Sequence, residues 1–134
     1  MRPEPRNILE ILGIKITLSK RQELANVRDI DYGSMFIGDD LISHNCILDN
    51  TLYNESMDIL FFVKINHLNN YQWLSLNFYD FKSKTGYQFY REFDMLYLKE
   101  FISENEIHVY NSFNDRAGNN FFFKLDEEEF YQIT

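Results

Sequence analysis

The alternation of apolar residues between positions 59 and 81 constrains the fold more than any other part of the sequence. In an extended strand, every second side chain lies on the same face, and the first half of this stretch places four apolar residues on one face: Ile59, Phe61, Val63 and Ile65. A polar turn at 67–70 leads to a second strand, Tyr71–Phe81, and a turn at 83–86 leads to a third, Tyr87–Phe93. Short turns join antiparallel neighbours, so we expect an antiparallel sheet.

Two further strands and two helices are expected in the C-terminal part. The strands are Ile107–Phe113 and Phe121–Leu125. Asp94 can cap a helix because four apolar residues follow it at helical spacing: Met95, Leu98, Phe101 and Ile102. Asp126 can cap a terminal helix, since Glu127, Glu128 and Glu129 would suit the positive end of the helix dipole.

The N-terminal part is less regular. Asn7 and Glu10 form a pattern typical of a helix start, which predicts a helix over 7–12. A short strand over 14–18 and a helix from Ser19 to Val27 follow; one continuous helix over 7–27 is the alternative. Between 29 and 58, short apolar pieces are separated by acidic turns. The fold expected from these patterns is a single α+β domain, residues 1–134, with a mostly antiparallel sheet of about five or more strands and helices packed on one face.

The charge of the chain is −8, and it is unevenly distributed. Residues 29–58 carry seven carboxylates and no Lys or Arg, and residues 92–134 form a second acidic block. A solvated face would explain such blocks, but a binding site for a basic partner would explain them as well. We predict that the first block contacts a basic partner through these residues: Asp29, Asp31, Asp39, Asp40, Asp49, Glu55 and Asp58. The acidity makes nucleic acid an unfavourable partner.

Two aromatic residues extend the predicted partner-binding surface. Trp73 and Tyr79 share a strand face with Ser75 and Asn77. Aromatic rings mixed with small polar groups are typical of protein-binding surfaces. An RNA-stacking sheet would need a flanking basic motif, and the sequence has none.

No catalytic or metal-binding pattern is present. His44 and Cys46 are two residues apart, but a cysteine nucleophile also needs a third group that orients its base, and a buried cysteine is the more common case. The three histidines lack the spacing of metal ligands, and the five glycines form no phosphate-binding loop. We therefore expect no enzymatic activity, no cofactor and no metal.

The N-terminal residues and the single cysteine favour a cytoplasmic protein. Met1–Pro5 lacks the order of a signal peptide, and one cysteine cannot form an internal disulfide. No apolar run reaches the length of a membrane helix.

In size, acidity, single-domain organisation and aromatic-rich α+β pattern, the whole chain resembles the immunity proteins that bacteria make against polymorphic or contact-dependent toxins. The resemblance implies a tight, stoichiometric inhibitor of a cognate toxin protein, often a basic nuclease. Two other functions remain open: a phage-encoded inhibitor of a host defence nuclease, and a small ligand-binding domain or enzyme with an aromatic-lined pocket.

Overall fold

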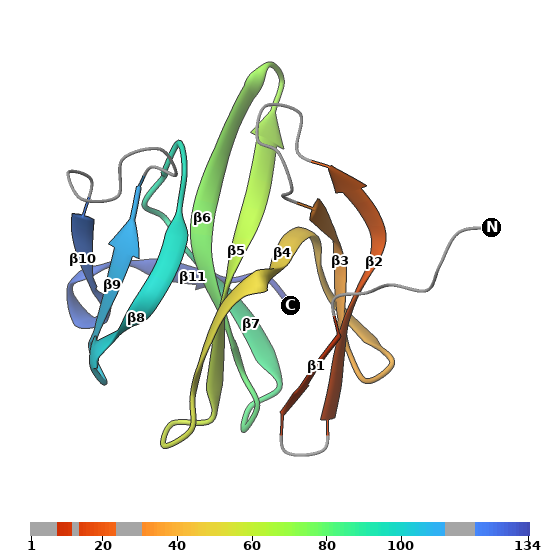
Figure 1. The fold of residues 1–134 in the computed structure, drawn as a ribbon, viewed down its shortest axis with the longest axis horizontal. Helices are drawn as coiled ribbons and strands as arrows, with labels where there is room; N and C mark the ends of the chain where they lie inside the picture. The colour runs from red at the N-terminus through yellow and green to blue at the C-terminus, as the bar shows by residue number, and fades with distance from the viewer. Residues whose placement is uncertain (1–7, 12–13, 24–30, 112–119) are drawn as a thin grey trace. The chain divides into compact units, whose positions relative to one another are not determined.

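The computed structural model describes residues 8–11, 14–23, 31–111 and 120–134, and almost all regular structure in them is antiparallel β-sheet (Figure 1). The chain divides into two compact units, Met1–Asp49 and Asn50–Thr134, and the boundary falls inside β4. The strands are β1 (Ile8–Ile11), β2 (Ile14–Glu23), β3 (Asp31–Ile37), β4 (Asp40–Asn54), β5 (Ile59–Leu68), β6 (Tyr71–Asp80), β7 (Thr85–Phe89), β8 (Tyr97–Ser103), β9 (Glu106–Tyr110), β10 (Asn120–Lys124) and β11 (Phe130–Gln132).

The prediction of an α+β fold is wrong. The described residues contain no α-helix, and a single 3₁₀ turn, Leu125–Glu127, is their only helical element. β1 and β2 replace the described parts of the two N-terminal helices, and β8 replaces the helix expected after Asp94. Asn7 and residues 24–27, which the N-terminal helix predictions included, lie outside the described residues.

The apparent helical spacing in β8 has a physical explanation in irregular strand pairing. The pairing of β8 with β9 shifts register between Leu98 and Glu100, and again between Phe101 and Ser103. An extra residue in a strand changes the spacing of same-face side chains from two to three. Leu98 and Phe101 therefore follow the spacing of a helix while lying on a strand. The pairing of β2 with β3 shifts in the same way between Ser19 and Gln22.

The terminal segment forms a strand because it pairs with β7. Tyr90 N donates to Glu129 O at 3.1 Å, and Ile133 N donates to Gly86 O at 2.8 Å. The 3₁₀ turn before β11 has no side-chain cap, so Asp126 does not cap a helix. Tertiary pairing has overridden the local preference for a helix.

Two antiparallel sheets make up most of the second unit. One has the order β5-β6-β7-β11, and the other has the order β10-β9-β8. The predicted hairpin of β5 and β6 is confirmed, with Val63 paired to Leu76 at its centre. β7 is shorter than predicted, because Phe93 forms only an isolated bridge with Leu74.

The apolar faces of these two sheets pack together. Phe61 of β5 lies against Phe101 of β8 with ring centroids 5.7 Å apart, and Phe89 of β7 lies against Phe123 of β10 at 4.9 Å. Fully buried side chains on the facing sides of both sheets surround these rings: Val63, Leu76, Ile107, Val109 and Phe123. Burial of these side chains is the main favourable contribution to folding of the unit.

The described part of the first unit is an antiparallel meander in which each strand pairs with the next. Gly38, with φ of +63°, lies in the β3–β4 turn, where the sequence predicted a turn. A left-handed conformation of this kind favours glycine. Ile16 and Met35 are fully buried. The part of the chain that the structure describes contains no helix with the length and apolar character of a membrane span.

Candidate functional site

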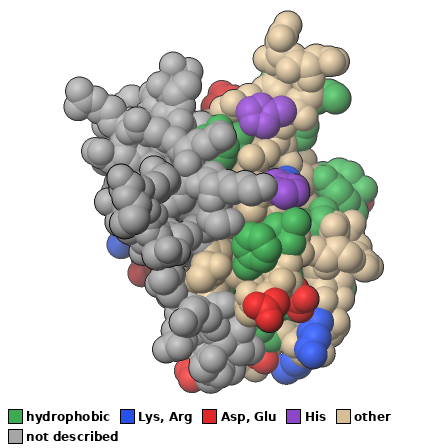
Figure 2. Space-filling model, turned by 90° about the vertical axis from the view of Figure 1, so that its right-hand side faces the viewer, with side chains coloured by type: hydrophobic (Ala, Val, Ile, Leu, Met, Phe, Trp, Pro, Cys, Tyr) green, Lys and Arg blue, Asp and Glu red, His purple; other side chains and the backbone are tan. Residues whose placement is uncertain are grey.

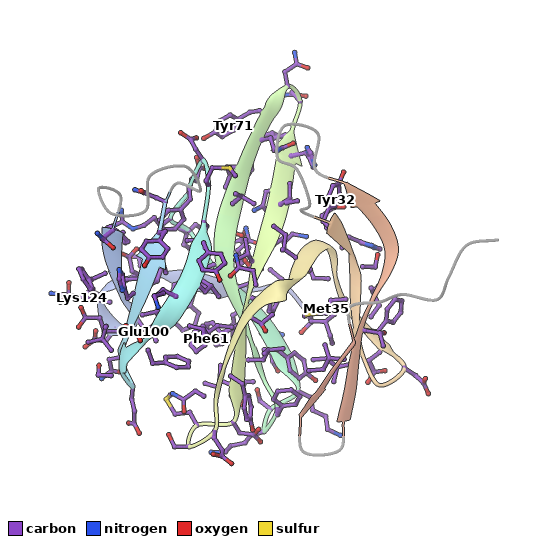
Figure 3. All side chains as sticks on the ribbon, viewed as in Figure 1. Tyr32, Met35, Phe61, Tyr71, Glu100 and Lys124 are labelled. Carbon is purple, nitrogen blue, oxygen red and sulfur yellow. The ribbon has the colours of Figure 1, made fainter. Side chains whose placement is uncertain are left out.

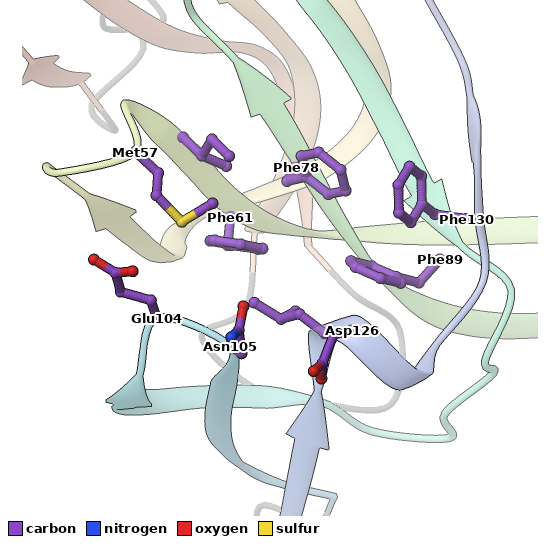
Figure 4. Close-up of a pocket in the computed structure, with 10 residues that line it drawn as sticks. Met57, Phe61, Phe78, Phe89, Glu104, Asn105, Asp126 and Phe130 are labelled. Carbon is purple, nitrogen blue, oxygen red and sulfur yellow. The ribbon is translucent and has the colours of Figure 1, made fainter.

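An apolar pocket of about 210 Å³ lies in the second unit, where its two sheets meet (Figure 4). Its lining comes from β5, β6, β7 and β11, from the β4–β5 and β8–β9 turns, and from the 3₁₀ turn. The lining residues are Met57, Ile59, Phe61, Phe78, Phe89, Glu104, Asn105, Leu125, Asp126 and Phe130.

Aromatic rings on one face of the larger sheet form the floor of the pocket. The Phe78 ring lies centrally among its neighbours, with centroid distances of 5.7 Å to Phe61, 5.5 Å to Phe89 and 5.3 Å to Phe130. The tilted and edge-on angles between these rings are the arrangements that aromatic pairs prefer. Phe130 remains 47% exposed, so the floor continues to the surface.

Polar residues at the β8–β9 turn and at the 3₁₀ turn lie opposite this floor. Figure 4 shows the side chains of Glu104, Asn105 and Asp126 on the side of the pocket away from the rings. Leu125 N donates to Asn105 O at 2.7 Å, which ties the two turns together. Glu104 and Asp126 are exposed. Two carboxylates therefore lie at the rim of an aromatic pocket.

The β4–β5 turn brings Met57 to the same rim and is braced by side-chain hydrogen bonds. Asn54 Oδ1 accepts from Ser56 Oγ at 2.9 Å and from Met57 N at 3.0 Å. Ser56 Oγ also lies 3.1 Å from Glu104 Oε2, to which it can donate, so this turn and the β8–β9 turn are linked. The bracing holds the flexible thioether of Met57 at the mouth of the pocket.

A further hydrogen bond closes the base of the same turn. Tyr53 donates its hydroxyl proton to Asp58 Oδ1 at 2.7 Å. This bond to a carboxylate raises the pKa of Tyr53 to about 12. The phenol is protonated at physiological pH, as it would also be at its ordinary pKa of 10.0, and it can donate to Asp58.

The charge at the pocket is negative. The described lining includes two carboxylates and neither Lys nor Arg. Glu55 in the β4–β5 turn and Glu127 and Glu129 after Asp126 are exposed on the segments that carry the rim. Carboxylates beside an apolar surface attract a group that is both cationic and apolar.

The volume of the pocket limits what it can hold. Pockets for drug-sized ligands and cofactors enclose roughly 300–1,000 Å³, whereas this one encloses about 210 Å³. The space suits one large side chain or a fragment-sized molecule. The pocket has the dimensions of an anchor site for a protein partner.

The acidic residues that were predicted to bind a partner do not form one cluster along the chain; they lie on several turns and strands. Glu55 and Asp58 lie in the β4–β5 turn beside Met57 and therefore belong to the surroundings of the pocket. Asp39 and Asp40 are exposed at the β3–β4 turn of the first unit. Asp31 begins β3 and Asp49 lies in β4, whereas Asp29 lies outside the described residues.

The predicted aromatic surface on β6 is largely covered. The Trp73 ring is half-buried and stacks on the exposed Tyr71 ring at 5.2 Å, close to the tip of the β5–β6 hairpin (Figure 3). Tyr79 is buried and packs edge-on against Phe81. Ser75 and Asn77 are fully buried. Of this set, only Trp73 presents appreciable surface to a partner.

His44 and Cys46 do not share a strand face. Asn45, between them, has φ of +59°, and the pairing of β3 with β4 shifts register at this point. As a result, His44 is exposed, with Nδ1 2.8 Å from Ser34 Oγ, while Cys46 is fully buried. Within the described part of the chain, no group of three or more His, Cys, Asp or Glu side chains is arranged to hold a metal ion.

The sequence did not indicate the pocket. Its phenylalanines are most simply interpreted as core residues, which is correct for the buried Phe61 and Phe89, and Asp126 was assigned to a helix cap. A usable signal was present in the C-terminal acidic run, because it is followed directly by Phe130 and Tyr131. Figure 2 shows one face of the molecule on which hydrophobic and acidic side chains lie close together.

Comparison with protein-family models, with curated proteins and with solved structures returned no match for this chain.

Proposed function

We propose that this chain is a binding protein of the toxin-immunity type, which neutralises a basic toxin protein by binding it without chemistry of its own. The observation that carries the proposal is the phenylalanine-floored pocket with Glu104 and Asp126 at its rim. An apolar centre surrounded by a charged rim is the usual anatomy of a protein interface.

The energetics of protein recognition support a protein partner. A few anchor side chains in well-packed pockets commonly supply most of the binding free energy. Tyr, Trp and Arg are the most common anchors, and each is of a size for this pocket. The rim carboxylates then favour an anchor that is basic or is flanked by basic residues, because opposite charges speed association and select the partner.

The first experiment compares two charge reversals of equal size. Glu104→Lys with Asp126→Lys changes the pocket rim, whereas Asp39→Lys with Asp40→Lys changes the acidic turn of the first unit. The ligand is the candidate toxin, which is the protein encoded by the gene next to the gene for this chain. Binding kinetics are measured at low and high salt. We expect the rim reversal to slow association at least tenfold at low salt, with a smaller difference at high salt.

The matched reversal at Asp39 and Asp40 identifies the acidic block that binds. If it slows association while the rim reversal has no effect, the binding site lies in the first unit and the proposal for the pocket is wrong. Rescue of cell growth from the toxin provides a second readout, and it should be lost in the rim variant alone.

The second experiment tests the apolar part of the site. Met57 is 36% exposed at the pocket mouth, and Met57→Glu places a charge there. Leu68→Glu, at an even more exposed position in the β5–β6 hairpin, is the matched control. We expect Met57→Glu to increase the dissociation rate more than tenfold and Leu68→Glu to leave it unchanged. Equal effects of the two variants would contradict an anchor site at the pocket.

A small-ligand-binding domain is a second candidate, favoured by the aromatic floor of the pocket. Its ligand would be a fragment-sized organic cation. Saturable binding of such a cation by the wild type, combined with absence of binding to any basic protein, would favour this function over the first.

A further inference from the structure

The outer edge of β11 offers backbone hydrogen-bonding groups to a partner strand. β11 is the last strand in the order β5-β6-β7-β11 and pairs with β7 on one side. In this pairing, Phe130 lies opposite Phe89 and Gln132 lies opposite Tyr87. Within the described residues, no strand pairs with the other side of β11.

The hydrogen bonds between β11 and β7 show which backbone N–H and C=O groups of β11 point away from β7. Glu129 O accepts from Tyr90 N, and Ile133 N donates to Gly86 O, so these two residues direct their groups toward β7. In an antiparallel pair, alternate residues direct N–H and C=O to opposite sides. Phe130 and Gln132 therefore direct their N–H and C=O groups outward. The paired stretch extends from Glu129 to Ile133, which is long enough to align a short added strand.

The side chains along this edge do not protect it. Natural proteins commonly guard an exposed edge with a very short strand, Lys, Pro or a bulge. β11 is short, with three residues, but it contains no Lys, Pro or bulge. Phe130 and Tyr131 are 47% and 38% exposed. Phe130 also lines the pocket, so the open edge and the pocket adjoin at one residue.

The charge beside the edge indicates the chemistry of the added strand. Four acidic residues, 126–129, precede β11 directly. Arg91 pairs with Glu128 at 2.9 Å, while Asp126, Glu127 and Glu129 are exposed. A second copy of this chain is the poorer occupant, because each copy carries a net charge of −8 and this acidic segment. Like charges brought together oppose pairing.

We propose that an extended, basic segment of the protein partner adds to the sheet as a strand alongside β11. This inference rests on the proposed function and specifies how the partner binds. Strand addition supplies affinity through main-chain hydrogen bonds and specificity through pockets for alternate side chains. The outward groups of Phe130 and Gln132 supply the hydrogen bonds, and the adjoining pocket with its acidic rim supplies the selectivity.

A pair of substitutions at Gln132 isolates the backbone contribution. Gln132→Pro removes the outward N–H but leaves the hydrogen bonds to β7, and proline is tolerated on edge strands whose N–H faces away from the sheet. Gln132→Ala removes the same side chain and keeps the N–H. We expect Gln132→Pro to weaken binding of the neighbouring gene's product at least tenfold relative to Gln132→Ala, with both variants folded by circular dichroism. Equal affinities for the two variants would overturn strand addition.

A synthetic probe tests the same edge without the partner. The probe is a short peptide of alternating Arg and Val, and the controls are its Glu/Val counterpart and an Arg/Val peptide with every second amide N-methylated. We expect the Arg/Val peptide to slow hydrogen exchange of the Phe130 and Gln132 amides, and the two controls to leave exchange unchanged. Protection elsewhere alone, or protection of both amides by self-association without peptide, would contradict the proposal.

These results separate the inference from the proposed function. If the Glu104/Asp126 reversal abolishes partner binding while Gln132→Pro does not, the pocket binds the partner but strand addition is wrong. If neither change affects binding, the proposed function at this site fails as well.

Discussion

The Ser75 hydroxyl donates to Asn77 Oδ1 at 2.6 Å, and both side chains are fully buried. Asn77 Nδ2 donates in turn to Gln88 Oε1 at 3.1 Å, Gln88 Nε2 donates to Asn66 Oδ1 at 3.1 Å, and Asn66 Nδ2 returns to Ser75 Oγ at 2.9 Å. The four side chains form a closed ring across β5, β6 and β7. Every member is both donor and acceptor, so the ring compensates the cost of burying four polar groups.

Removing one hydroxyl from this ring should destabilise the protein. Ser75→Ala leaves Asn77 Oδ1 without the hydroxyl donor, and it leaves Asn66 Nδ2 with only the longer 3.4 Å hydrogen bond to Lys64 O. Both side chains are buried. An unsatisfied buried polar group costs about 1–3 kcal/mol, so we expect the free energy of unfolding to fall by about that amount in urea titrations.

Ser83→Ala is the matched control for this experiment. Ser83 is exposed in the β6–β7 turn, and surface substitutions usually change stability by less than about 0.5 kcal/mol. A similar small effect of Ser75→Ala would show that the ring contributes little to stability.

Asn50 should be equally sensitive because it satisfies two backbone groups at β8. Its Nδ2 donates to Leu96 O at 3.0 Å, and its Oδ1 accepts from Leu98 N at 2.9 Å. The side chain is buried. Asn50→Asp removes the donor and places a carboxylate in a buried site, so we expect a loss of more than about 2 kcal/mol.

Asn70→Asp is the control, because Asn70 is exposed in the β5–β6 turn. Thermal unfolding at neutral pH compares the stabilities of the two variants. Because a buried carboxylate prefers to be protonated, acidification should restore part of the stability of Asn50→Asp. A loss that does not depend on pH would argue against a buried charge at this position.

The phenol of Tyr53 should lose its proton at a higher pH than an ordinary tyrosine. The hydrogen bond to Asp58 raises its pKa from 10.0 to about 12. A group whose pKa is higher in the folded state stabilises that state below the unfolded pKa, and this contribution disappears as pH rises through the folded pKa. The contribution of Tyr53 should therefore be complete below pH 10 and lost between pH 10 and 12.

Tyrosinate absorbance measures this directly. The titration of wild type minus that of Tyr53→Phe should give one step with a midpoint near 12, and stability should decline less in the variant above pH 10. A midpoint near 10 in the difference curve would mean that the Tyr53–Asp58 hydrogen bond does not persist in solution.

The sequence alone predicted the β5–β6 hairpin because two strand-like apolar segments are joined by a short turn and neither contains an inserted residue. β5 and β6 pair without a register shift, from Ile59 opposite Asp80 at one end to Leu68 opposite Tyr71 at the other. Every side chain therefore keeps the face that its position predicts. The turn at Gly38 and Asp39 was also predictable, because glycine adopts the left-handed backbone that such a turn requires.

The acidity that favours a basic partner was visible in the sequence, but the pocket was not. Glu104, Asp126 and Phe130 are far from Phe61 in sequence and meet only because β11 pairs with β7 and the two sheets of the second unit pack face to face. Neither pairing leaves a periodic signal in the segments that form it.

The sequence by itself determined the alternation of side chains along a strand. This alternation is local, because the backbone of a strand fixes the directions of its own side chains. Within the described residues, tertiary pairing made strands of the segments that the sequence predicted to be helical. In β8, the register shift between Leu98 and Glu100 gave Leu98 and Phe101 a spacing of three. After the acidic residues 126–129, hydrogen bonds to β7 made Phe130–Gln132 an edge strand instead of the continuation of a helix. Local preferences of a few tenths of a kcal/mol per residue yield to such pairing and burial. The acidic-rimmed pocket and the open edge of β11 exist because of that outcome.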